Sequence, residues 1–540
     1  MNTFQFVNAS KWLYAAIGNF CCYTPNQDIL TRFLNNPEAR FWEDTFSAFA
    51  CIIYNQRDNH IVMVRDHFGL EPLFYLQLNN QIIFGSNIPD LLKHIENKPT
   101  ENNRYIEDYL SGVYTNFCRY SEETHLQDIF RVKSGHLLTI TSNNNIESKP
   151  YWSLAKHTNY VRFADEREYL ERFTELLLEG IKLNLVENES PAAEFSGGLD
   201  SSCVVNGLHQ LGLSPKLYMH IASSDGDEID DSEYAHEFVK QLGIEDKLVG
   251  VSADDFDLLS VVNEISDLFA GGFTYLFPVG ANNIHKEISR NKHKIVFSGF
   301  GGDECVSGHA PLLIYLRELS VNKNYSKMEE EIKLHFSTQG LRQSNLREKW
   351  LFYRNKYQFI DKIVFNYKLN QEKAKFKRAG IDYKTRSEYL TSISKFESEL
   401  ICGDYSHHVM MRIEESAIVA RHYGFKYCYP LLYPPLVEFC NQLPLHFKRN
   451  NGENRIMIRN YLSQFFPSAV YSKHQKVGGI MPATVSKMKQ EYLSGRYEGI
   501  LCNPSYDEFT NRLAKIYPNG SHQHLINKIF ITALRVAKSS

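Results

Sequence analysis

A short apolar run that meets a Gly- and Ser-rich turn constrains this chain more than any other feature. Residues 191–195 are typical of a strand, residues 196–202 (Ser-Gly-Gly-Leu-Asp-Ser-Ser) of a tight turn, and residues 203–208 of a helix start. Two glycines let the backbone approach a ligand closely, and the N–H groups and hydroxyls at a helix start favour an anion. The turn therefore predicts a phosphate-binding loop.

An acidic residue inside this loop indicates a metal. Asp200 would repel phosphate groups unless it holds a divalent cation bound to them, so the sequence implies Mg²⁺. The pattern is not the mononucleotide P-loop, because no Gly-x-x-x-x-Gly-Lys-Ser/Thr occurs. A second turn at residues 298–304 (Ser-Gly-Phe-Gly-Gly-Asp-Glu) also follows an apolar run, and its Asp303 is a second candidate ligand.

Both turns resemble motifs of one family. The turn at 196–202 resembles the pyrophosphatase loop of ATP-dependent adenylating enzymes, and its leucine and doubled serine narrow the resemblance to the asparagine synthetase family. The turn at 298–304 resembles that family's second metal-binding motif. The resemblance implies ATP and Mg²⁺, with Asp200 and Asp303 as metal ligands. It implies nucleotide contacts by Ser196, Gly197, Gly198, Leu199, Asp200, Ser201, Ser298 and Gly299.

The strand signals predict the fold around these turns. Apolar runs near positions 191, 217, 247 and 294, with helical patterns between them, predict an open, mostly parallel sheet whose ligand lies at the carboxyl ends of the strands. The resemblance extends this to a synthetase domain over 151–540, an α/β fold of the adenine-nucleotide α-hydrolase-like (PP-loop) type with a helical C-terminal half. An amphipathic helix over 166–185 opens it.

The first 150 residues predict a different domain. Residues 46–92 alternate short apolar runs with polar turns, which indicates an antiparallel meander. The segments 65–75 and 82–88 resemble the α+β, Ntn-type glutaminase β-sandwich that opens asparagine synthetases, so we expect a glutaminase-like domain over 1–150, joined to the synthetase domain by an aromatic junction at Tyr151 and Trp152.

This first domain is expected to be vestigial. A glutaminase of this type uses a cysteine directly after the initiator Met, but position 2 is Asn. Cys21 or Cys22 would serve only after removal of about twenty residues, and nothing around Phe20 resembles a processing site. We therefore expect the nitrogen nucleophile to come from a source other than glutamine.

Composition sets broad limits. The 540 residues suffice for about two to four domains. The 59 basic and 63 acidic residues give no nucleic-acid signature, and ten cysteines without a Cys-x-x-Cys pair argue against zinc or a disulfide framework and for a reducing compartment. With neither an export signal nor a long apolar span, the sequence predicts a cytoplasmic protein without membrane or nucleic-acid partners.

Amide formation also needs a cation and a base. Lys476 is the candidate cation, because the Lys-Val-Gly at 476–478 resembles an element of β-lactam synthetase, and Lys473 is the alternative. Glu414 is the candidate base, because it lies sixteen residues before Pro430 as in β-lactam synthetase-like members, and Glu415 competes. For both Lys476 and Glu414, the other interpretation is a surface side chain without a catalytic role.

The predicted function is an ATP-dependent ligase that adenylates a carboxylate, releases pyrophosphate and joins the acyl group to an amine. Phe300 stands where family members carry Glu, Tyr or His, and it cannot relay a proton. With the missing glutaminase cysteine, this favours the branch of β-lactam synthetases and lasso-peptide cyclases, and within it macrolactam formation in a lasso-type peptide. That implies a substrate with carboxylate and amine, a leader-peptide-binding protein and a protease.

Other functions stay open. An ammonia-dependent asparagine synthetase and a β-lactam synthetase-like small-molecule cyclase are alternatives within the family. A catalytically inactive scaffold belongs to another class and is disfavoured by the intact Asp200 and Asp303, and a tRNA-modifying adenylase is disfavoured by the near-neutral charge. The locally basic segment 342–386 is interpreted either as a solvated helical face or as a docking surface for an acidic peptide or another subunit.

Overall fold

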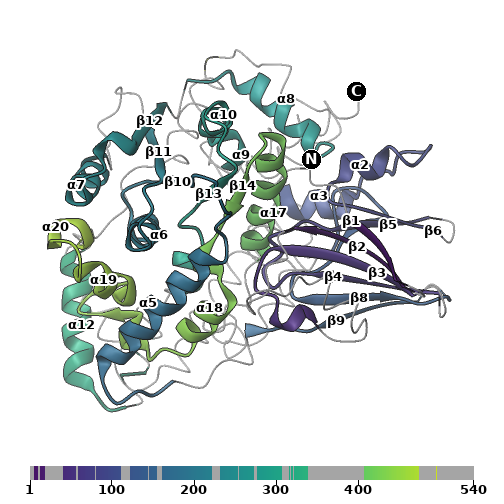
Figure 1. Cartoon of the computed structure of the whole chain (residues 1–540). Helices are drawn as coiled ribbons and strands as arrows, with labels where there is room; N and C mark the ends of the chain where they lie inside the picture. Colours follow the sequence, from purple (N-terminus) through teal and green to yellow (C-terminus); the bar gives the residue numbers. More distant parts are fainter. Residues whose placement is uncertain are drawn as a thin grey trace.

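The chain forms two β-rich halves (Figure 1). The computed structural model describes residues 5–9, 12–18, 41–55, 59–78, 81–110, 122–143, 145–154, 161–221, 232–252, 255–272, 277–306, 315–316, 318–319, 322–338, 407–472 and 494. Asn2, Cys21, Cys22 and the basic segment 342–386 lie outside the described residues, so the predictions made for them stay predictions.

The N-terminal half contains two antiparallel sheets. One has six strands in the order β1-β2-β3-β4-β8-β9 and the other has three in the order β6-β5-β7. The strands are β1 (Gln5–Ala9), β2 (Trp12–Gly18), β3 (Phe49–Asn55), β4 (His60–Arg65), β5 (Phe74–Leu78), β6 (Gln81–Gly85), β7 (Ile129–Arg131), β8 (His136–Ile140) and β9 (Ile146–Pro150). Short helices η1 (Phe41–Asp44), α2 (Ile88–Leu92) and α3 (Asn103–Leu110) accompany them. The antiparallel pairing predicted for residues 46–92 is confirmed for β3 with β4 and for β5 with β6, but the two pairs belong to different sheets and do not form one meander.

Alternation along the strands builds the sandwich. Ala50 and Ile52 of β3 point into a core shared with β5, where they meet Leu73 and Tyr75, whereas Phe49 and Cys51 face the opposite side of the six-stranded sheet. Successive side chains of a strand point to opposite faces, so one strand serves two cores. The α+β character predicted for this half is therefore observed.

The second half is built on a five-stranded parallel sheet in the order β12-β11-β10-β13-β14. Its strands are β10 (Ala192–Glu194), β11 (Lys216–Ile221), β12 (Leu248–Ser252), β13 (Ile295–Phe297) and β14 (Lys426–Cys428). Four of these strands occur at the predicted positions, and β14 was not predicted. Because the chain runs from β10 to β11 and β12 and then returns to β13, the strand order reverses between β10 and β13. Open α/β sheets bind ligands at such a switch point.

Helices cover both faces of this sheet (Figure 1). Ala193 and Phe297 pack against one set of helices and Ala192 and Val296 against another, which is why the strands read as continuous apolar runs. The helices are α5 (Glu166–Lys182), α6 (Leu199–Gln210), α7 (Ser232–Leu242), η3 (Glu245–Lys247), α8 (Leu258–Leu268), α9 (Phe277–Gly280), α10 (Asn282–Arg290), η4 (Gly302–Val306), α12 (Tyr325–Thr338), α17 (His407–His422), η6 (Pro430–Leu432), α18 (Pro434–Asn441), η7 (Leu445–Phe447), α19 (Ile456–Ser463) and α20 (Ser468–Tyr471). A two-stranded ribbon, β15 (Arg449–Asn450) and β16 (Glu453–Asn454), precedes α19.

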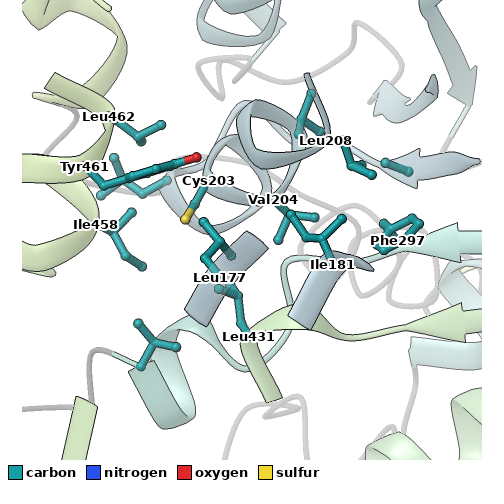
Figure 2. Packing of buried hydrophobic residues seen from close by; sticks show 14 of the residues in the cluster. Leu177, Ile181, Cys203, Val204, Leu208, Phe297, Leu431, Ile458, Tyr461 and Leu462 are labelled. Carbon is teal, nitrogen blue, oxygen red and sulfur yellow. The ribbon is translucent and has the colours of Figure 1, made fainter. Parts of the chain in front are cut away.

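The largest core ties α6 to segments that are distant in the sequence. Figure 2 shows Cys203 and Val204 of α6 surrounded by Leu177 of α5, Leu431 of η6 and Ile458 of α19. All five side chains are almost fully buried. The helix that follows the predicted phosphate loop is therefore fixed from three sides, which gives the loop a rigid base.

The two halves share an extensive contact. Phe74 and Ile129 of the three-stranded sheet pack in one apolar cluster with residues of α8 and α17. The predicted aromatic junction joins the halves by hydrogen bonds, since the Tyr151 hydroxyl donates to the Arg65 carbonyl at 2.9 Å and the Trp152 indole donates to Glu438 at 2.7 Å. Among the described helices, none combines the length and apolar character that crossing a membrane requires.

Candidate functional site

The predicted phosphate loop lies at the carboxyl end of β10 and leads into α6. Gly197 has φ +68°, and a Cβ on it would lie 2.7 Å from the backbone nitrogen of Ala235, so the turn needs glycine. Gly198 is the N-cap of α6 and no side chain caps this helix end. The first N–H groups of α6 therefore stay available to a bound anion.

The serines of this loop make only weak contacts with one another. The Ser196 and Ser201 hydroxyl oxygens lie 3.4 Å apart, and the Ser201 hydroxyl donates to the Gly198 carbonyl at 3.1 Å. Hydroxyl bonds are normally about 2.7 to 2.8 Å long and the group rotates freely about its C–O bond. Both hydroxyls can thus turn toward a phosphate oxygen at little cost.

The second turn packs directly on the first. A Cβ on Gly299 would lie 2.5 Å from the backbone nitrogen of Ser201, and a Cβ on Gly302 would lie 2.3 Å from the carboxyl carbon of Asp200. Gly301 between them has φ +101°. Glycines are required here because two backbones meet at the switch point of the sheet.

One arginine joins the two predicted metal ligands. Arg455 Nη1 lies 3.1 Å from Asp200 Oδ2, and Arg455 Nη2 pairs with Asp303 Oδ1. The Asp200 and Asp303 side chains are 18% and 34% exposed, so both are partly accessible at this edge, although Asp200 Oδ1 itself is buried. The two carboxylates therefore converge on one position, where they now hold a cationic group.

This arrangement fits a magnesium–phosphate group. Mg²⁺ prefers oxygen ligands and is typically bound in nucleotide sites by one or two carboxylates, with phosphates and water completing its coordination. Asp200 and Asp303 supply two such carboxylates. The Nε of Arg455 is buried and has no hydrogen-bond acceptor among the described residues, which leaves a donor for a phosphate oxygen in the same place.

Arg455 was missed as an individual site residue. The sequence shows a basic helix over residues 452–459, but it does not show that Arg455, at the start of α19, reaches across to α6. Arg455 has φ +58°, a left-handed conformation that costs a non-glycine residue about 1 to 2 kcal/mol. Strained backbone of this kind often occurs at functional sites, and the helix propensities of the sequence do not predict it.

Glu414 does not lie at this site. Its carboxylate pairs with Arg65 Nη1 at 2.9 Å and with Arg131 Nε at 3.2 Å, both from the N-terminal half, and all three side chains are almost fully buried. Protonation of this carboxylate would remove the negative charge that both buried guanidinium groups contact. The predicted role as catalytic base is therefore not supported by its surroundings, and Glu414 instead joins α17 to the two sheets.

Phe300 adopts a defined role next to the second turn. Its ring lies 4.2 Å from the guanidinium carbon of Arg412 and meets Tyr429 edge-on at 6.0 Å between centroids. The neighbouring Glu304 accepts a hydrogen bond from the Gly301 N–H at 3.1 Å, so this acid braces the turn. Phe300 is therefore buried beside a cation, Arg412, that the sequence analysis did not predict there.

Glu194 is the buried acid at the end of β10. It accepts hydrogen bonds from the hydroxyls of Tyr427 and Ser298, and burial raises its pKa. A glutamate inside the apolar run 191–195 was the available sequence signal, because a buried carboxylate requires partners. Lys476 and Lys473 lie outside the described residues, so the role predicted for Lys476 stays a prediction.

Comparison with known proteins identifies the family. The family model described as "Asparagine synthase" matches residues 172–525, which is more than half of the chain. The chain belongs to the asparagine synthase family. Members of this family are ATP-dependent carbon–nitrogen ligases, and the chain is an enzyme of this kind. A second model, "Glutamine amidotransferase domain", matches residues 28–152, which contain strands β3 to β9 of the two-sheet half.

The relatives are distant. The chain is 22% identical over 483 residues to asparagine synthetase (glutamine-hydrolyzing) 1 of Bacillus subtilis strain 168, which covers 85% of this chain and 72% of that protein. It is 24% identical over 317 residues to asparagine synthetase (glutamine-hydrolyzing) 2 of the same strain, covering 56% and 42%. It is also 24% identical over 276 residues to amidase chry2 of Gibberella zeae, covering 48% and 40%. The chain thus spans less than half the length of the second and third of these relatives.

The amidotransferase-like half contains one described cysteine within residues 28–152. Cys51 lies on β3, is fully buried, and burial raises the pKa of its thiol. A nucleophilic cysteine needs access and an accessible thiolate. Cys51 therefore has a packing role and not a catalytic one.

Proposed function

We propose that this chain activates a carboxylate by adenylation at the expense of ATP and then joins it to an amine. The carrying observation is the direct packing of the two glycine turns, which brings the carboxylates of Asp200 and Asp303 together on one guanidinium. Mg²⁺, when bound there with ATP, would neutralise phosphate charge and orient the α-phosphorus.

The residues of the site have separate tasks in this proposal. The N–H groups at the start of α6 and the hydroxyls of Ser196 and Ser201 hold phosphate oxygens. Asp200 and Asp303 hold the metal. Arg455, freed from the two carboxylates when the metal binds, turns its guanidinium to the phosphates. Each carboxylate thereby exchanges its contact with a guanidinium for a contact with the metal, and Arg455 exchanges carboxylate partners for phosphate partners.

The chemistry follows from the weakness of a carboxylate as an electrophile. A carboxylate oxygen bonds to the α-phosphorus, the bond from that phosphorus to the bridging oxygen breaks, and pyrophosphate leaves with the electron pair. The amine then attacks the acyl carbon, loses a proton and expels AMP. Lys476 is retained as the proposed cation for the developing negative charge.

We further propose that the joined groups belong to one substrate, and that the product is a macrolactam of the lasso-peptide type. Phe300 supports this, because it removes a proton-relay side chain and gives the site an apolar wall. The partners would be a peptide with a free amine and a carboxylate, a leader-peptide-binding protein and a protease. Asparagine formation is the second candidate, because two relatives are named asparagine synthetases.

Nucleotide products test the proposal. Purified chain with ATP and Mg²⁺ is given either L-aspartate with ammonium or a peptide that begins with Gly and carries Asp about eight residues later. AMP, pyrophosphate and a peptide lighter by one water support the macrolactam, whereas AMP with asparagine supports the second candidate.

Variants test whether the predicted metal ligand is needed. Asp303→Asn should abolish either reaction, and Asp246→Asn, which changes an exposed acid, should not. ADP as the product contradicts adenylation, and no nucleotide turnover with any carboxylate supports the inactive scaffold.

A further inference from the structure

Arg412 on α17 lies beside two aromatic rings and has no role in the site described so far. Its guanidinium carbon lies 4.4 Å from the ring centroid of Phe277 and 4.2 Å from that of Phe300. An aromatic ring attracts a cation over its face, and this attraction grows as water is excluded. Two rings therefore fix the orientation of the guanidinium and leave its N–H donors for another group.

Arg412 carries its charge on a partly buried side chain. Among the described residues, none forms an ion pair with it. Its charge is close enough to lower the pKa of Glu194, although burial outweighs this effect and raises the pKa overall. The Glu194 carboxylate is already satisfied by the hydroxyls of Tyr427 and Ser298. Arg412 is thus a partly buried cation with open donors, which is costly unless an anion completes it.

The position of Arg412 relates it to the nucleotide site. Phe300, which covers one face of the guanidinium, lies between Gly299 and Gly301 of the second turn. Gly299 packs on the backbone of Ser201, and Gly302 packs on the carboxyl group of Asp200. Only one aromatic ring therefore separates the guanidinium from the turn that carries the predicted metal ligand.

We propose that Arg412 binds the substrate carboxylate that becomes adenylated. This inference rests on the proposed function and identifies the group that presents the reacting oxygen. A guanidinium matches a carboxylate with two parallel N–H donors, and the flanking rings exclude water and strengthen both bonds. The carboxylate keeps a lone pair for attack on the α-phosphorus, and Arg412 stays protonated throughout.

Binding measurements separate this role from a structural one. Wild-type protein is saturated with Mg²⁺ and α,β-methylene-ATP, which cannot release pyrophosphate, and is titrated with L-aspartate and with a short peptide amide whose only carboxylate is an Asp side chain. We expect at least one of these carboxylates to bind, and the same peptide with Asn in place of Asp to bind about tenfold or more weakly.

Variants assign the effect to the side chain. Arg412→Met, which keeps an apolar group between the two rings, should weaken carboxylate binding about 10- to 100-fold and leave the affinity for the nucleotide analogue unchanged. Arg412→Lys should recover part of the loss because it restores the charge without the planar fork. Arg290→Met is the matched control, since Arg290 lies on the exposed side of α10 and pairs with Glu287. It should bind as wild type does.

The outcomes are distinguishable. Equal carboxylate binding by wild type and Arg412→Met overturns the inference, and so does an equal loss of carboxylate and nucleotide binding, which indicates a structural role. Failure of wild-type protein to bind the analogue in Mg²⁺ contradicts the proposed function itself. The inference is also contradicted if neither L-aspartate nor the Asp peptide binds the wild-type protein more tightly than it binds Arg412→Met.

Discussion

Single glycines decide whether the two acid-bearing turns can meet. At Gly302 the nearest atoms to an added Cβ belong to the Asp200 side chain, whereas at Gly299 they belong to the backbone of Asp200 and Ser201. The phosphate loop and the metal turn are therefore in contact without any intervening side chain. Such close contact requires glycine on one side, and the second turn has glycine at both contacts, Gly299 and Gly302.

Gly302→Ala should displace Asp200 and abolish the ligase reaction. The added methyl group would lie 2.3 Å from the carboxyl carbon of Asp200, so one of the two turns must shift. We expect a loss of about 1 to 3 kcal/mol in the free energy of unfolding, as for overpacked cores, and weaker nucleotide binding. Urea unfolding and titration with α,β-methylene-ATP measure the two effects. Gly85→Ala is the control, because its nearest contact is a movable Leu91 methyl at 3.3 Å. Wild-type nucleotide affinity in Gly302→Ala would contradict the proposed contact.

At the scale of elements, α17 carries two different functions on its surface. Arg412 faces the second turn, and Glu414 faces Arg65 and Arg131 of the N-terminal half. Figure 1 shows the helix lying between the parallel sheet and the antiparallel strands. The guanidinium of Arg65 also donates to the Gly69 and Glu71 carbonyls, each at 2.8 Å, so the ion pair is anchored in a tight turn. The helix therefore links the second turn of one half to the core of the other.

Glu414→Gln tests whether this residue stabilises the interface or acts as a base. Because the Arg65 and Glu414 side chains are only 2% and 4% exposed, loss of the carboxylate removes the negative charge that pairs with the buried Arg65 guanidinium. We expect a loss of about 3 to 5 kcal/mol in the free energy of unfolding. Glu175→Gln, which removes an exposed pair with Arg172, should change it by less than about 0.5 kcal/mol. Wild-type stability combined with lost ligase activity would instead restore the prediction that Glu414 is the catalytic base.

The sequence predicts elements well where local patterns decide them. Strands β10, β11, β12 and β13 occur where apolar runs place them, helix α5 begins at residue 166 as predicted, and both acid-bearing turns occur where their glycines predict them. Strand β14 was missed although β10 and β13 are equally short, because it begins with Lys426 and Pro430 follows two residues after its end, so its apolar run is interrupted at both sides. The partners of Glu414 were also not foreseen, because its spacing from Pro430 does not tell which segments its face of α17 meets.

Contacts between distant segments are what the sequence does not contain. Arg455 lies 255 residues from Asp200, and Arg131 lies 283 residues from Glu414, so no local pattern relates them. The stacking of Arg412 between Phe277 and Phe300 likewise requires three segments to be placed first. The residue types in the two turns predict metal and phosphate ligands. The arginines beside them, Arg455 and Arg412, can be assigned only from the packing.

At the scale of the whole molecule, buried histidines should make stability depend on pH. Burial lowers the pKa of His67, His220 and His285 to about 3. It lowers the pKa of His125 to about 4. His67 lies among aromatic rings, including those of Tyr151 and Trp152, and its Nδ1 has no hydrogen-bond partner among the described residues. In the folded state these rings remain neutral at pH values where an unfolded chain would protonate them.

The sign of the effect follows from proton binding. Between about pH 6.5 and pH 4 the unfolded chain binds more protons at these histidines than the folded chain, so stability falls as the pH is lowered. From pH 7.5 to 5.5 each histidine should cost about 1.4 kcal/mol. Asp66 acts in the opposite direction, because burial raises its pKa to about 6 and its protonation over this range should return about 0.8 kcal/mol. Four histidines outweigh one aspartate, and the protein should be less stable at pH 5.5.

His67→Phe isolates one contribution to this pH dependence. Phenylalanine fits among the surrounding rings and cannot bind a proton in the unfolded chain, so the difference in unfolding free energy between pH 7.5 and pH 5.5 should shrink by about 1.4 kcal/mol. Urea unfolding at the two pH values gives this difference. His209→Gln, which replaces an exposed histidine on α6, should leave it as in wild type. An unchanged difference in His67→Phe would mean that His67 is protonated equally in the folded and unfolded states, and the aromatic packing around it would then have to admit a charged ring.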